Sequence, residues 1–93
     1  MKLMLTQAQM ELSKALTENV ELIMFTIWSG GYATSWCYVR ASDSKYIRIS
    51  PLLREEVSIT RIWEDLENWN RNYYCEPCRD GKMLFLEFKR RNE

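Results

Sequence analysis

Histidine is absent from this 93-residue chain, and glycine and proline are scarce, at three and two residues. Without histidine the chain contains no Ser-His-Asp or Cys-His triad, no imidazole metal ligand and no general base of the commonest kind. Tyrosine, lysine and carboxylate side chains remain, but their spacing indicates no catalytic constellation. We therefore expect no catalytic residues, no cofactor and no enzymatic activity.

Net charge is also lacking, because 13 basic residues balance 13 acidic ones. A balanced chain has no general attraction for nucleic acid or for an anionic membrane. No apolar run approaches the roughly 18 residues of a membrane helix, and the residues after Leu5 are too polar for a signal peptide. The three cysteines are an odd number, which favours reduced thiols. We expect a cytoplasmic protein with no membrane partner.

What the chain has is apolar and aromatic content, at 46% and 13% of its residues. This composition predicts one α+β domain over residues 1–93, with residues 90–93 as a solvated tail. The predicted order is α-β-β-β-α-β, an antiparallel sheet packed by helices. The predicted helices span 6–18 and 59–73, and the predicted strands span 21–28, 32–40, 45–50 and 82–89. Residues 52–56 favour a turn or two of helix, and residues 72–81 a loop.

Local signals support these elements. Thr6 and Gln9 have the spacing of a capping box at the start of the first helix. The strand at 21–28 is apolar on both alternating sets, which is typical of a central strand covered on both faces. The helix at 59–73 carries an apolar stripe broad enough to cover the main face of the sheet. The sequence does not decide which of the two faces the first helix covers.

The two middle strands alternate more clearly. We expect one set of side chains to point inward, with Cys37 as a small core residue: Ser35, Cys37, Val39, Ala41, Ile47 and Ile49. The other set would then form an outward aromatic-basic face, which is the candidate partner-binding site: Trp36, Tyr38, Arg40, Tyr46 and Arg48.

Such a face has three interpretations. Its rings and arginines are the side chains that dominate protein interfaces, and they also suit base stacking on single-stranded nucleic acid. Alternatively, cross-strand aromatic pairs merely stabilise a half-exposed sheet. We favour a protein partner, because the balanced charge argues against nucleic acid. The predicted function is a small non-enzymatic adaptor, regulator or inhibitor, of the accessory type that phages and mobile elements carry.

Self-association is a further alternative. A structural subunit or homodimer would use the side of the first strand that carries Met24 and Trp28, or an edge strand of the sheet.

Cys75 and Cys78 form a single C-x-x-C motif and are weak candidates for metal or redox chemistry. A zinc site needs four ligands, and only Cys37 and carboxylates remain to complete it. A redox pair is usually placed at the start of a helix, whereas this motif follows a predicted helix and precedes a turn. We expect no metal here, and both thiols keep no assigned role.

Overall fold

A computed structural model describes residues 4–91. The first helix, α1 (Gln7–Thr17), is followed by four strands, β1 (Leu22–Ser29), β2 (Tyr32–Ser42), β3 (Lys45–Ile49) and β4 (Arg54–Ser58). The second helix, α2 (Ile59–Asn70), precedes β5 (Tyr73–Asp80) and β6 (Met83–Arg90). The order is therefore α-β-β-β-β-α-β-β, which confirms the α+β class and adds two strands to the expected ones.

The capping box explains where α1 begins. The Thr6 hydroxyl accepts a hydrogen bond from the Gln9 backbone N–H at 3.2 Å, and the Gln9 side chain accepts one from the Thr6 N–H at 2.8 Å. Two N–H groups that the helix leaves unpaired are thereby satisfied. The apolar side of α1 buries Ala8, Leu12 and Ala15 in the core.

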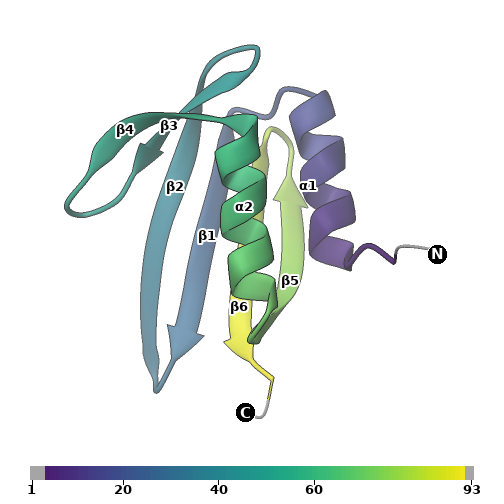
Figure 1. Cartoon of the computed structure of the whole chain (residues 1–93), viewed down its shortest axis with the longest axis vertical. Helices are drawn as coiled ribbons and strands as arrows, with labels where there is room; N and C mark the ends of the chain where they lie inside the picture. Colours follow the sequence, from purple (N-terminus) through teal and green to yellow (C-terminus); the bar gives the residue numbers. More distant parts are fainter. Residues whose placement is uncertain (1–3, 92–93) are drawn as a thin grey trace.

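All six strands form one sheet, in the order β4-β3-β2-β1-β6-β5. The expectation of an antiparallel sheet is wrong at one pair, since β1 and β6 run parallel while every other pair is antiparallel. The parallel pair arises because β6 enters the centre of the sheet beside β1 after the chain has passed through α2 and β5 (Figure 1).

Two segments predicted to be helix or loop are strands. The segment 54–58 pairs with β3, and the turn before it closes through backbone hydrogen bonds between Ser50 and Leu53, at 2.9 and 3.4 Å. Pro51 therefore opens a hairpin turn instead of a helix. The segment 73–80 pairs with β6. It tolerates Pro77 because β5 is an edge strand, where a missing N–H breaks no ladder.

The tail predicted at 90–93 begins later than expected. Arg90 is the last residue of β6, and the Arg91 side chain donates a 3.0 Å hydrogen bond to the Asn70 carbonyl. The rest of that tail, 92–93, lies outside the described residues.

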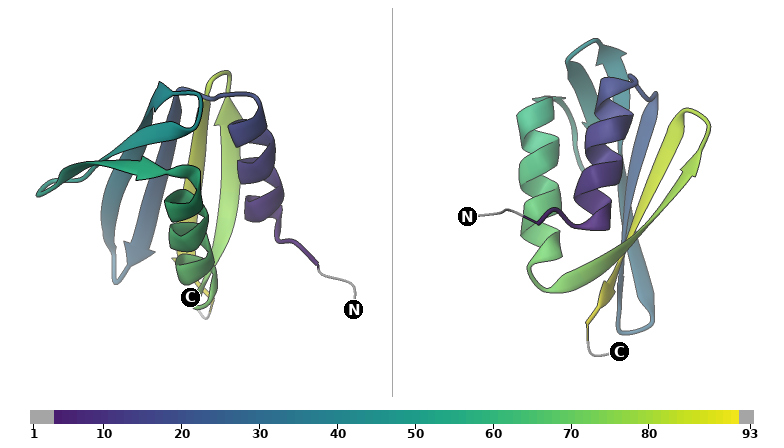
Figure 2. Two further views of the ribbon diagram at one scale, coloured as in Figure 1. Left: turned by 45° about the horizontal axis from the view of Figure 1, so that its top comes forward. Right: turned by 90° about the vertical axis from the view of Figure 1, so that its right-hand side faces the viewer.

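Both helices pack on the same face of the sheet. The edge-on view shows α1 and α2 on one side of the sheet, and within residues 4–91 no element lies on the other (Figure 2, right). The burial pattern agrees, because Ile23, Phe25 and Ile27 of β1 are buried, whereas Met24 is only partly covered and Trp28 is exposed. The expectation that β1 is covered on both faces is therefore wrong. The molecule is a two-layer domain with one core between the helices and the sheet.

The β3–β4 hairpin leaves the direction of the other strands. It crosses them steeply and curls toward the N-terminal end of α2, into which β4 leads directly (Figures 1 and 2). The strands β2, β1, β6 and β5 run side by side (Figure 1) and form what we call the four-strand panel. This panel carries most of the uncovered sheet surface.

One-sided coverage predicts unequal costs for neighbouring truncations in β1. We expect Phe25→Ala to lower the free energy of unfolding by about 3–5 kcal/mol, because it empties space in the core. Met24→Ala should cost about 1 kcal/mol or less, because its side chain loses little buried area on the uncovered face. Urea unfolding followed by tryptophan fluorescence measures both. Equal costs would mean that both faces of β1 are covered.

Candidate functional site

The structure reverses the predicted direction of the aromatic-basic face. Trp36, Tyr38 and Tyr46 are 8%, 0% and 1% exposed and lie in the core between the sheet and the helices. Arg40 and Arg48 are mostly buried beside them, with side chains 27% and 19% exposed. The period-2 pattern correctly predicted which residues share a face. The pattern could not predict which of the two faces the helices cover. The large rings fill the space between the sheet and the helices better than the smaller side chains of the other face would.

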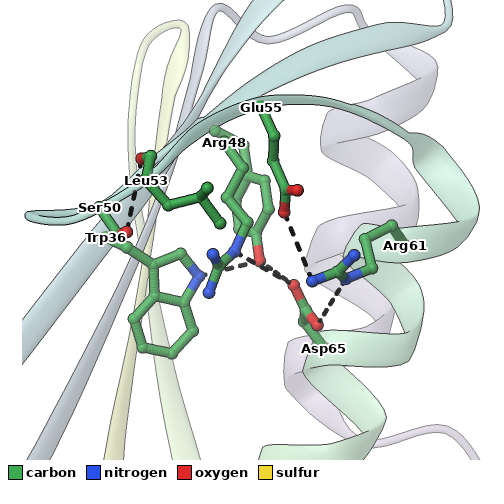
Figure 3. Close-up of polar contacts among 8 residues, drawn as sticks. Trp36, Arg48, Ser50, Leu53, Glu55, Arg61 and Asp65 are labelled. Atoms are coloured by element: carbon green, nitrogen blue, oxygen red, sulfur yellow. Dashed lines mark hydrogen bonds and ion pairs between the residues drawn. The ribbon is translucent and has the colours of Figure 1, made fainter.

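The buried members form a polar cluster with α2, which we call the Asp65 cluster: Trp36, Tyr38, Arg48, Glu55, Arg61 and Asp65. The indole N–H of Trp36 donates to the Tyr38 hydroxyl at 2.9 Å, and that hydroxyl donates to the Asp65 carboxylate. The Arg48 guanidinium lies 5.4 Å from the centre of the Trp36 ring and 3.8 Å from Asp65 (Figure 3). These contacts join β2 and β3 to α2.

The outer side of the Asp65 cluster is an ion-pair chain. Arg61, one helical turn before Asp65, lies 3.4 Å from that carboxylate and 3.5 Å from Glu55 of β4 (Figure 3). Two guanidinium groups thus meet two carboxylates, and the cluster carries no net charge. These partly buried ion pairs connect α2 to β3 and β4.

The Asp65 cluster also holds Tyr38 in its protonated form. Burial, together with the hydrogen bond to Asp65, raises the pKa of Tyr38 far above its ordinary value. A phenol that keeps its proton and gives its hydrogen bond to a fixed carboxylate is not prepared to act as a base. The cluster therefore works as a structural joint. Tyr46 has a similar role, since its hydroxyl donates to the Val20 carbonyl at 3.1 Å.

Cys75 and Cys78 lie on opposite faces of β5. Cys75 is half-buried on the helix side, and Cys78 is exposed on the other side. Residues three apart in a strand have Cα atoms about 10 Å apart, whereas a disulfide requires less than about 7 Å. The two thiols cannot form a disulfide or share one metal ion while β5 is intact. Within residues 4–91, no group of three or more cysteine and acidic side chains has metal-binding geometry.

Cys37 is likewise on the uncovered side, so its assignment to the core is wrong. It belongs to the surface that we call the open face, formed by the sheet side chains that neither helix covers. Strand pairing aligns these side chains in rows across the sheet. Two adjacent rows are almost wholly apolar along the centre: Ile47, Val39, Leu22 and Met83 in one, and Ile49, Cys37, Met24 and Phe85 in the other.

The open face becomes more polar toward the C-terminal ends of β1 and β6. The third row contains Thr26 beside Ser35, whose hydroxyl groups are 3.1 Å apart, and two glutamates, Glu76 and Glu87. The fourth row contains two exposed rings, Trp28 at 40% and Tyr74 at 36%, on either side of Lys89. Lys89 forms a 3.2 Å ion pair with Glu76. The open face thus has an apolar band and a polar border.

The sequence contained one signal for this surface. The apolar character of both sets in β1 indicated that the Met24 and Trp28 side needs a contact, and self-association through that side was one stated alternative. The contribution of β5 to this surface was not predicted, because residues 72–81 were expected to form a loop.

Comparison with known proteins yields no match, since no protein family, curated protein or solved structure is significantly similar to this chain. The candidate site therefore follows from its own geometry. None of the helices described between residues 4 and 91 is long and apolar enough to cross a membrane.

Removing the Tyr38 hydroxyl tests the Asp65 cluster. We expect Tyr38→Phe to lower the free energy of unfolding by about 1–3 kcal/mol at neutral pH, because Trp36 loses an acceptor and Asp65 loses a donor. Since the pKa of Tyr38 is raised on folding, this contribution is complete below about pH 10 and falls at higher pH. The difference between variant and parent should therefore narrow above pH 10.

Urea unfolding at a series of pH values measures that difference. Tyr32→Phe, at a site that is 80% exposed, controls for the loss of a hydroxyl group. A Tyr38→Phe cost that does not depend on pH up to 11 would contradict the assigned hydrogen bonds.

Thiol reactivity tests the direction in which each strand faces. With a maleimide reagent under native conditions, we expect Cys78 to react first and Cys37 more slowly, because burial raises the pKa of Cys37. Cys75 should react last, since burial and the neighbouring Glu76 raise its pKa to about 12. Peptide mass spectrometry against time gives the three rates. Faster reaction at Cys75 than at Cys78 would show that β5 faces the other way.

Proposed function

We propose that this protein is non-enzymatic and acts by binding another protein through the open face. The observation that carries the proposal is the apolar band, in which side chains from β3, β2, β1 and β6 lie side by side without a covering layer. A contiguous apolar patch rimmed by polar residues is rare on a monomer and marks interaction surfaces. Such a surface suits an adaptor, regulator or inhibitor, of the accessory type that phages and mobile elements carry. We place this activity in the cytoplasm.

The charge of the open face favours protein over nucleic acid. Three basic side chains lie on it, Lys45, Arg54 and Lys89, against four acidic ones, Glu56, Glu76, Asp80 and Glu87. Phosphate binding requires an excess of basic groups along the contact. The rings that would have stacked on bases, Trp36, Tyr38 and Tyr46, are buried. Support for a single-stranded nucleic-acid ligand is therefore weak.

Two variants isolate the open face with little risk to folding. Trp28→Glu and Val39→Glu change side chains that are 40% and 37% exposed on it. Thr34→Glu is the matched control, because Thr34 is exposed on the opposite face of β2, the strand that carries Val39. Circular dichroism and urea unfolding show whether all three variants keep the fold.

The functional test is affinity capture from a lysate of the protein's own host, with and without nuclease. Bound proteins are identified by mass spectrometry, and each is then purified and titrated against the variants by calorimetry. We expect a discrete protein that survives nuclease, binds parent and Thr34→Glu equally, and binds Trp28→Glu and Val39→Glu at least about tenfold more weakly. Binding that is insensitive to both open-face variants, or that nuclease abolishes, would refute the proposal.

A further inference from the structure

We propose that the protein partner at the open face is a second copy of this chain, docked face to face about a two-fold axis that runs along the strands between β1 and β6. This inference rests on the proposed function, because it names the occupant of the same surface. The result is a symmetric dimer in which two sheets pack against each other and the helices lie outside.

The area of the panel fits a dimer. Four strands at about 4.8 Å spacing and eight residues at about 3.3 Å rise give roughly 500 Å² per copy, or about 1,000 Å² in total. Specific interfaces begin at about that size. The β3–β4 hairpin curls toward the helix side (Figure 2), so it leaves the panel free to approach another sheet.

The charges on the panel select one orientation. On the open face of the panel, all four charged side chains belong to β5 and β6: Glu76, Asp80, Glu87 and Lys89. β1 and β2 present only uncharged side chains there. An axis along the strands between β1 and β6 lays each charged half over the partner's uncharged half. A two-fold axis across the strands would instead place β5 and β6 over themselves and bring acidic groups together.

The same axis matches the apolar rows. Because β1 and β6 are parallel and in register, the rotation sets each residue of β1 over its row neighbour in β6 of the other copy. Met24 then meets Phe85, a favourable sulfur–aromatic contact, and Trp28 meets Lys89, a cation–π contact. In the same way Leu22 meets Met83. Twisted sheets pack face to face with their strands within about 30° of each other, which keeps these central contacts.

Ser35 provides a charge-reversal test of this orientation. The axis places Ser35 opposite Glu76 of the second copy, since the two share a row with Thr26 and Glu87. Ser35→Lys should therefore tighten the dimer and Ser35→Glu should weaken it, each by about threefold to tenfold. Both substitutions remove the same hydroxyl contact with Thr26 at an exposed site, so they control for each other.

Sedimentation equilibrium over a wide range of concentrations measures the dissociation constant for the parent, both Ser35 variants and Trp28→Glu. A parent dimer that Trp28→Glu disrupts, with opposite effects of the two Ser35 variants, supports the proposal. Ser35 effects of the same sign, or none, would overturn the orientation. A parent protein that is monomeric at all concentrations would overturn the dimer. The proposed function would still stand in that case if a protein captured from the lysate binds the parent and no longer binds Trp28→Glu. A dimer insensitive to Trp28→Glu would overturn the dimer through the open face.

Crosslinking gives an independent check on Cys75→Ser protein. The axis places Cys37 opposite Cys78 of the second copy, since these residues share a row with Met24 and Phe85. A short bis-maleimide should join Cys37 of one chain to Cys78 of the other, and mass spectrometry identifies the linked peptides. Covalent dimers linked mainly through two copies of Cys37 or two copies of Cys78 would contradict the axis.

Discussion

Two helices of 11 and 12 residues, each about 17 Å long, face a six-stranded sheet in this domain. Helices of that length can cover one side of such a sheet but not both. The rest of the structure follows from this limit. Trp36, Tyr38 and Tyr46 of β2 and β3 turn toward the helices, and the hairpin β3–β4 closes over the end of α2. The apolar side chains on the opposite face of the sheet are left uncovered.

The Asp65 cluster explains how so short a helix holds its position. α2 contributes Ile62 and Leu66 to the core, and its Asp65 accepts from Tyr38 while Arg61 reaches back to Glu55. Asp65 thereby ties the helix to β2 and β3, and Arg61 ties it to β4. The charges within the cluster cancel, and its contacts fix α2 on the sheet.

Much of the fold could be predicted from the sequence. The capping residues of α1, the apolar stripe of α2 and the alternation in β2 are local signals, and the structure confirms them. The strand β5 was not predictable in the same way, because Pro77 and a run of polar residues are typical of a loop and are tolerated only at a sheet edge. The parallel pairing of β1 and β6 depends on contacts between distant segments, which local patterns do not encode.

The candidate site shows more clearly what local sequence patterns cannot predict. Alternation places Trp36 and Tyr38 on one face and Cys37 and Val39 on the other, but either face satisfies a period of two. The decision depends on where α2 packs and on the pairing of Tyr38 with Asp65, 27 residues later. A face rich in arginine and aromatic rings thus became the core, and the face judged to be the core became the open one.

The central claim is that one face of the sheet is uncovered in the isolated chain. Solvent paramagnetic relaxation of methyl groups, measured by NMR at the lowest workable concentration, tests it most directly. The account predicts strong relaxation for Val39, Ile47 and Ile49 on the open face and weak relaxation for Ile23, Ile62 and Leu86 in the core. Equal protection of both groups at that dilution would show that the open face is covered within a single chain, and would contradict the account.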